Sequence, residues 1–162
     1  MPFLYMEKWR WRGMAKYTAR QIAIWFLRKN RIVRDEADAD SISNLKLQKL
    51  LYYAQGCYLA ITDEPLFDEN ILAWKHGPVV YEVYQSYKKY GSNGIPDDEL
   101  ECVNVDAYTE NILDQVYNVF GQYSAWGLRN MTHQERPWIE TDPNDVMKLN
   151  LIKEYFKENY IA

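Results

Sequence analysis

The side chains best suited to chemistry are the chain's two histidines, His76 and His133, together with Glu135. Two imidazoles and a carboxylate form the ligand set of many open metal sites, and a histidine beside a carboxylate can act as an acid–base pair. The spacing fits no standard zinc pattern, and a general base also needs a nucleophile and an orienting partner within reach. We therefore predict no metal, no cofactor and no catalytic residue. A small hydrolase or ligand-binding enzyme that uses these three side chains is the alternative.

His76 and Glu135 also have structural explanations. His76 precedes Gly77 and Pro78, a pair typical of a turn followed by the first turn of a helix, and a histidine there can hydrogen-bond across the turn. Glu135 stands three residues after Thr132, which is the spacing of a capping box at the start of a helical turn. A structural or partner-facing role is therefore predicted ahead of catalysis.

Aromatic and basic side chains off the apolar stripes form a second candidate site, for contact with a partner. Tyr53 and Tyr81 fall off the main stripes of their predicted helices, and exposed aromatic rings are typical of interface hot spots. With neighbouring lysines, such rings can also stack on and clamp a nucleic acid. The candidate partner-binding residues are Lys49, Tyr53, Trp74, His76, Tyr81, Lys88, Lys89, His133, Glu135 and Trp138. The residues expected to serve the structure are Gly56, Gly77, Pro78, Thr132 and Pro137.

The charges are distributed unevenly along the chain. The net charge is −4, but the segment up to Arg34 carries +8 and the remainder carries −12. A basic head can be a nucleic-acid arm, or simply an upstream extension joined to an ordinary basic helix. No second helix stands at helix-turn-helix spacing, and an acidic body opposes phosphate binding, so we favour the second interpretation. The acidic body is expected to attract a basic partner.

The composition is that of one globular domain. The chain has 162 residues, of which 48% are apolar and 15% aromatic, enough for a core. Charges interrupt the apolar runs, which excludes a membrane-spanning helix and a signal peptide. Cys57 and Cys102 are too few for a disulfide framework, so a cytoplasmic location is expected. Residues 1–13 lack periodicity and are expected to be a disordered or loosely packed extension before a domain over 14–162, with Met6 or Met14 as the native start.

Periodicity predicts a mainly α-helical, single compact domain of about five to six helices with a small two-stranded β element. Residues 45–61 carry apolar side chains on two faces, which predicts a central helix where Gly56 lets a neighbouring backbone come close. The other helices are predicted over 19–30 with a Thr18–Gln21 capping box, over 78–90, after Asp106, over 124–130, at 132–138 and after Asp142-Pro143. The strands are predicted over 71–74 and 102–105.

Three segments resemble one known family. KLQKLLYYAQG (Lys46 to Gly56), PLFDENILAWKHGPVVYEVYQSYKKYG (Pro65 to Gly91) and THQERPW (Thr132 to Trp138) are similar to the Panacea antitoxin domain of SocA-like antitoxins and phage-associated GepA-like proteins. The resemblance extends over about residues 15 to 160 and keeps the order of the segments.

The resemblance implies a protein that binds and neutralises a toxin, usually one encoded beside it. Family members pair with several unrelated toxins, so the domain does not identify the toxin. In the SocA-like branch the antitoxin delivers its toxin to an ATP-dependent protease, and phage relatives occur without an obvious toxin. We expect a non-enzymatic protein that occludes a cognate toxin with the surface around residues 45–61, 78–90 and 132–138. A proteolytic adaptor is the first alternative.

Overall fold

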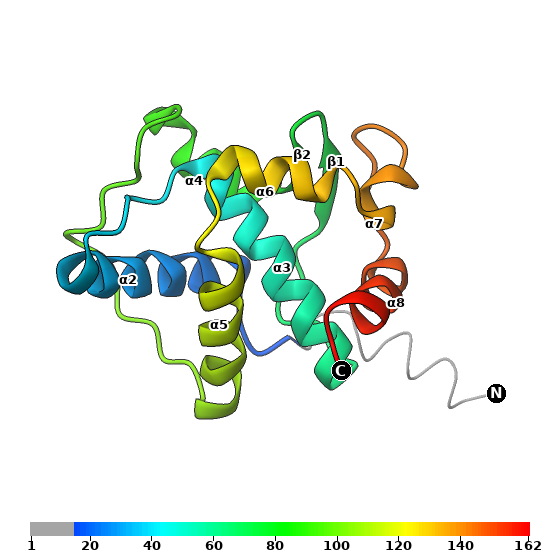
Figure 1. Cartoon of the computed structure of the whole chain (residues 1–162), viewed down its shortest axis with the longest axis horizontal. Helices are drawn as coiled ribbons and strands as arrows, with labels where there is room; N and C mark the ends of the chain where they lie inside the picture. The colour runs from blue at the N-terminus through cyan, green and yellow to red at the C-terminus, as the bar shows by residue number, and fades with distance from the viewer. Residues whose placement is uncertain (1–14) are drawn as a thin grey trace.

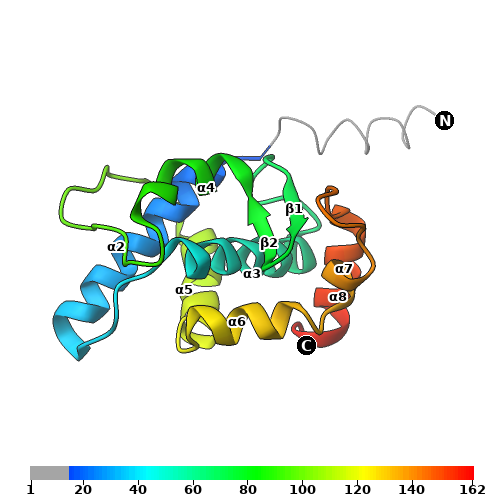
Figure 2. The same cartoon turned by 90° about the horizontal axis from the view of Figure 1, so that it is seen from above.

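Helix α3 (Asn44–Thr62) runs through the centre of the computed structural model, which describes residues 15–162 (Figure 1). Every residue from Leu47 to Ala60 is buried, because the β-hairpin and α4 cover one side of the helix and α5, α6 and α8 cover the rest (Figure 2). The predicted central helix is confirmed. The close neighbour of Gly56 is the ring of Phe156, which lies 2.4 Å from where a Cβ atom would be, rather than a backbone.

The other elements pack around α3. They are α2 (Ala19–Ala37), β1 (Ile71–Trp74), β2 (Gly77–Val80), α4 (Tyr81–Tyr87), the 3₁₀ turn η1 (Lys88–Tyr90), α5 (Ala107–Phe120), α6 (Ala125–Thr132), α7 (Arg136–Ile139) and α8 (Leu149–Asn159). The predicted fold class, mainly α with a small two-stranded sheet, is confirmed. The predicted extension over residues 1–13 lies outside the described residues. No helix within residues 15–162 is long and apolar enough to cross a membrane.

Helix α2 begins as predicted and ends later. Thr18 and Gln21 form the capping box, while the helix continues beyond Asn30 to Ala37. Its second half is polar, and cations on the helix and just before it contact residues 97–106 and α5. The ion pairs are Lys16–Asp106, Arg20–Glu101, Lys29–Asp114 and Arg34–Asp97, and Arg28 and Arg31 donate to backbone carbonyls of residues 97–101. The cations in the described part of the basic head therefore bind acidic groups and carbonyls of the same chain.

The hairpin corrects two predictions. β1 pairs antiparallel with β2, in the register Ile71↔Val80 and Trp74↔Gly77, and not with residues 102–105. Pro78 lies in β2, so the predicted helix start there is wrong, and α4 begins three residues later. A proline is tolerated on such an edge strand, where no ladder requires its missing N–H.

The other edge of β1 is covered by residues 144–147. The amide of Ala73 donates to Asp145 O at 2.9 Å and the amide of Met147 donates to Ile71 O at 2.8 Å. Asp142-Pro143 therefore leads into an extended strap and does not start a helix, because the backbone that follows is held by β1. The last helix, α8, begins at Leu149 instead.

A candidate partner-binding face

Buried polar side chains of α3 form hydrogen bonds to the backbone of the hairpin. Lys49 Nζ donates to Pro78 O at 2.9 Å, and Gln48 Oε1 accepts from the Val80 amide at 2.9 Å. Lys49 is fully buried, so its predicted contact with a partner is wrong. Burial, and then the nearby Arg129 charge, lower the pKa of the Lys49 amine to about 7.

Replacing Lys49 by methionine tests this amine. Its pKa in the folded chain, about 7, lies below the ordinary value of 10.5, so between these values the unfolded chain binds more protons than the folded chain. The contribution of Lys49 to stability is present above pH 10.5 and is lost as the pH falls toward 7. Between pH 7 and about pH 9, the free energy of unfolding in urea should therefore rise in the wild type by about 2 kcal/mol relative to Lys49→Met. A difference that does not change with pH would show that the amine stays protonated.

Glu135 is enclosed by tyrosine hydroxyls. Its carboxylate accepts from Tyr52 at 2.9 Å, from Tyr53 at 3.0 Å and from Tyr160. Burial raises the pKa of Glu135, and the hydrogen bonds from the three hydroxyls act in the opposite direction. Tyr53 is fully buried and stacks on Phe120, so its predicted outward position is wrong.

The predicted capping box at Thr132 and Glu135 is also wrong. The Thr132 hydroxyl donates to the carbonyl of Arg129 within α6, and Glu135 precedes α7 without a side-chain capping bond. The predicted helical turn does exist as α7, with Pro137 in its first turn. Glu135, which is 3% exposed, cannot touch a partner directly.

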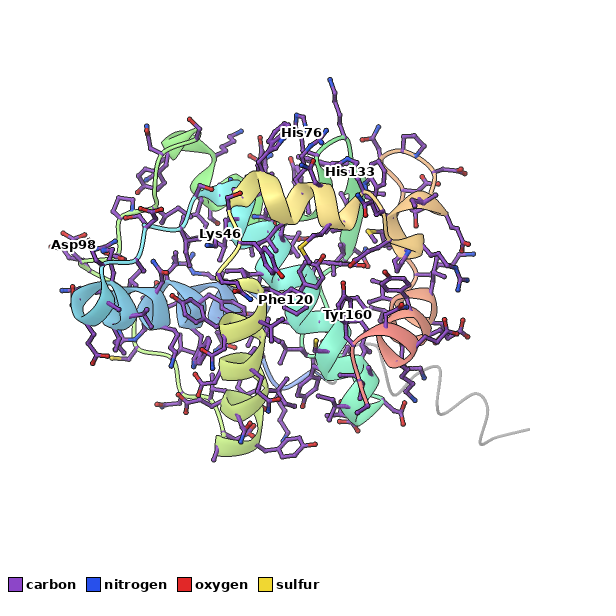
Figure 3. All side chains as sticks on the ribbon, viewed as in Figure 1. Lys46, His76, Asp98, Phe120, His133 and Tyr160 are labelled. Atoms are coloured by element: carbon purple, nitrogen blue, oxygen red, sulfur yellow. The ribbon has the colours of Figure 1, made fainter. Side chains whose placement is uncertain are left out.

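His76, His133 and Glu135 are engaged in different contacts. The two histidines lie near each other at the top of Figure 3, whereas the Glu135 carboxylate is bonded to the hydroxyls of Tyr52, Tyr53 and Tyr160. Both ring nitrogens of His133 face backbone carbonyls, those of Arg129 and Lys75, at 2.7 and 2.8 Å. Within residues 15–162, no three His, Cys, Asp or Glu side chains are grouped so that they could hold a metal ion.

The hairpin, the start of α4, α6 and α7 contribute side chains to one surface, here called the aromatic face. It consists of Trp74, His76, Tyr81, Trp126, Arg129, His133 and Trp138. Trp138 Nε1 donates to Trp74 O at 2.9 Å, and the rings of Trp138 and His133 are 3.9 Å apart. The Tyr81 ring lies 6.0 Å from Trp74, and the Trp126 ring lies 5.7 Å from His76. Backbone carbonyls thus hold the inner rings, and Trp126 and Tyr81 project into solvent, 53% and 45% exposed.

The aromatic face is cationic, in contrast to the chain as a whole. The Arg129 guanidinium lies 4.3 Å from the Trp126 ring centroid, and its Nε donates to His76 Nδ1 at 3.3 Å. The pKa of His76 is lowered by desolvation and then by the charges of Arg129 and Lys75. The basic partner that the net charge suggests therefore does not match this part of the surface.

The structure divides the predicted contact residues into three groups. Trp74, His76, Tyr81, His133 and Trp138 lie in the aromatic face, whereas Lys49, Tyr53 and Glu135 are buried beneath it. Lys88 and Lys89 are exposed in η1, beyond the far end of α4. The Lys89 amine lies over the ring of Tyr90, 5.2 Å from its centroid.

Sequence reasoning missed Trp126 and Arg129. A signal was present: the two are three residues apart just after the helix cap Ser124, so they share one side of α6. Leu128 and Thr132, on the other side, are buried.

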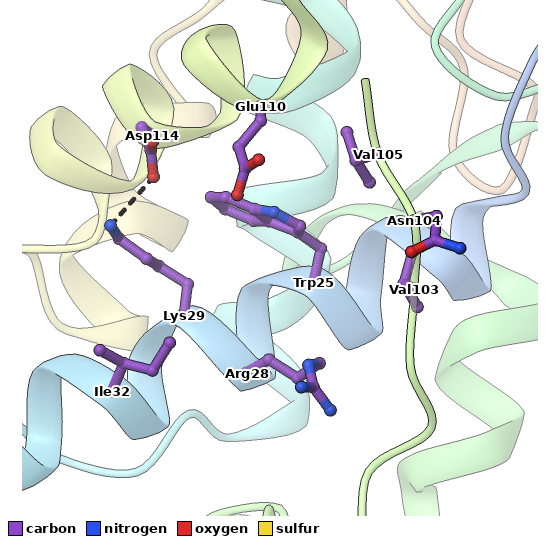
Figure 4. A pocket seen from close by; sticks show the side chains of 9 residues that line it. All are labelled: Trp25, Arg28, Lys29, Ile32, Val103, Asn104, Val105, Glu110 and Asp114. Atoms are coloured by element: carbon purple, nitrogen blue, oxygen red, sulfur yellow. Dashed lines mark ion pairs between the residues drawn. The ribbon is translucent and has the colours of Figure 1, made fainter. Parts of the chain in front are cut away.

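A hollow of about 340 Å³ lies elsewhere, between α2, the segment 103–105 and α5 (Figure 4). Trp25 lies between the two helices, and Lys29 pairs with Asp114 at 3.0 Å. Arg28 donates to the carbonyls of Leu100 and Glu101. Because its cations are already engaged, this hollow is a weaker candidate than the aromatic face.

The chain is similar in sequence to known antitoxins. A family model described as antitoxin SocA-like, Panacea domain, matches residues 47–139. Antitoxin SocA of Caulobacter vibrioides (strain NA1000 / CB15N) is 33% identical over 124 residues, which cover 68% of this chain and 66% of that protein. The match thus spans just under two thirds of the relative's length. No solved structure matches the chain significantly.

Proposed function

The chain belongs to the family of SocA-like antitoxins with a Panacea domain, and from this premise we propose that it neutralises a protein toxin by direct contact through the aromatic face. One observation carries the proposal: the whole aromatic face lies within residues 47–139, the part of the chain that the family model matches.

The physical character of the face supports contact rather than catalysis. Tryptophan, tyrosine and arginine are the residues that most often carry binding energy at interfaces, and here they stand on a rigid support. The indole of Trp138 and the imidazole of His133 are bonded to hairpin carbonyls, so little side-chain freedom would be lost on binding. A toxin held on such a surface is neutralised because its own working surface is covered.

Removal of the Trp126 ring tests the proposal. Trp126→Ala is expected to weaken binding of the protein encoded beside this chain by about 30-fold, the effect of a 2 kcal/mol hot spot, and to abolish rescue of cell growth. The matched control is Tyr108→Ala on α5, which removes a ring that is 61% exposed, outside the face. Both variants should keep the wild-type free energy of unfolding. If Trp126→Ala rescues growth as well as Tyr108→Ala does, the face is not the toxin site.

A second comparison separates occlusion from delivery to a protease. Occlusion predicts that the chain protects cells from the toxin whether or not ATP-dependent proteases are present, and that the lifetime of the toxin does not change. If protection is lost in cells that lack one such protease, the chain is an adaptor that uses the same contact.

A further inference from the structure

Arg129 is a partly buried arginine that has no acidic partner. No carboxylate lies within ion-pair distance of its guanidinium among residues 15–162. By contrast, Arg20, Lys29 and Arg34 of α2 pair with acidic side chains, and Arg136 pairs with Glu140. Arg129 donates only to uncharged acceptors, His76 Nδ1 and, at 3.0 Å, Asn130 Oδ1.

The guanidinium also keeps an open edge. Its Nε and Nη1 are engaged, but Nη2 has no acceptor within hydrogen-bonding distance in the described part of the chain. No buried polar side-chain atom there lacks a partner, so Nη2 is open to solvent. The ring of Trp126 lies against the guanidinium and restricts its motion. A planar, oriented guanidinium with free N–H groups is suited to a carboxylate.

Basic side chains gather at this point. Desolvation and then the charges of Arg129 and Lys75 lower the pKa of His76. An anion placed against Arg129 would relieve the repulsion within this group of cations. It would also bring its neighbouring atoms onto the exposed Trp126 ring.

We propose that the aromatic face takes a carboxylate side chain of its protein partner at Arg129, with an apolar neighbour of that side chain resting on Trp126. This inference rests on the proposed function, since it names the group by which the toxin is held. A protein is favoured over a nucleic acid because the chain carries a net charge of −4 and binding to phosphates needs several cations along a track. Here a single open guanidinium stands beside an aromatic ring.

The test is a titration of the isotope-labelled full chain, in which NMR monitors the Arg129 Nε–H and Trp126 Nε1–H signals. The probes are the blocked tripeptide acetyl-Leu-Asp-Leu-amide, the same peptide with asparagine in place of aspartate, and a ten-residue oligothymidylate. We expect saturable shifts with the aspartate peptide and at least about tenfold weaker binding of the asparagine peptide, a difference of about 1.4 kcal/mol. Equal binding of the two peptides, or no shift with either, overturns the proposal. Tighter binding of the oligothymidylate would assign the face to nucleic acid instead.

Two variants complete the test. Arg129→Gln should bind the aspartate peptide at least about tenfold more weakly, which again corresponds to about 1.4 kcal/mol. The control Arg136→Gln, which removes an exposed and ion-paired arginine outside the face, should not change it. Unchanged binding in Arg129→Gln overturns the proposal. The peptide titration contains no toxin, so it tests the carboxylate separately from the antitoxin role. A chain that rescues cells but does not bind the aspartate peptide refutes only the carboxylate. A chain that binds the peptide but never rescues cells refutes only the antitoxin role.

Discussion

Glu135→Ala is expected to lower the free energy of unfolding by about 4 kcal/mol. The change leaves the hydroxyls of Tyr52 and Tyr53 buried without an acceptor and opens a cavity between α3, α7 and the end of α8. Urea unfolding measures the free energy of unfolding of each variant. The slope of that free energy against urea concentration is compared between variants.

Two milder variants show whether the acceptor or the volume matters. Glu135→Gln keeps the shape but turns one acceptor into a donor, so about 2 kcal/mol should be lost. Tyr160→Phe removes one donor from a half-buried position and should cost about 1 kcal/mol. If Glu135→Ala costs less than Tyr160→Phe, the hydroxyl cluster does not stabilise the fold.

Gly77→Ala is expected to cost about 4 kcal/mol and to deform the aromatic face. Gly77 has φ of 105°, which L side chains rarely adopt, and an added Cβ would lie 2.7 Å from Thr132 Oγ1 and 2.8 Å from Lys49 Cε. Backbone strain and overpacking therefore add together. The backbone at His76 must shift, so binding to the toxin should weaken along with the fall in stability.

Gly91→Ala is the matched control. Gly91 also has a positive φ, of 58°, but an added Cβ would meet nothing within 4 Å. It should therefore cost only the backbone strain, about 2 kcal/mol, and leave binding unchanged. Equal losses of stability in the two alanine variants would show that the contacts of Gly77 with Thr132 and Lys49 add no cost beyond the backbone strain.

The sequence predicted the helices best where local signals act alone. Thr18 and Asp106 cap α2 and α5 as predicted, and the two apolar faces of residues 45–61 indicated a central helix. The hairpin was missed because Pro78 suits both a helix start and an edge strand, and only the pairing of β1 decides between them. The strap over residues 144–147 was missed for a similar reason, since its backbone bonds are made to a distant segment.

The candidate site was half predictable. Tyr53 and Lys49 were placed outside because a residue off the apolar stripe of an ordinary amphipathic helix faces water. Helix α3 has no outward face over this stretch, so these side chains had to find buried acceptors, Glu135 and the Pro78 carbonyl. Spacing along a sequence does not reveal that a helix is surrounded on all sides. Trp74, His76 and Trp138 lie in the aromatic face because the short elements β1 and α7 and the turn of the hairpin leave their side chains half-buried or exposed.

The buried polar side chains that position the hairpin and α7 are separate from the outer rings of the aromatic face. This separation determines which substitutions the fold can tolerate. Gln48, Lys49 and Glu135 position the hairpin and α7 from inside, whereas Trp126 and Tyr81 project outward and make no hydrogen bond to that interior. Substitutions at the two outer rings should therefore change the outer surface of the aromatic face at little cost to folding. A library randomised at these outer positions should yield stable chains with new specificities, whereas one randomised at the inner positions should yield mostly unfolded ones.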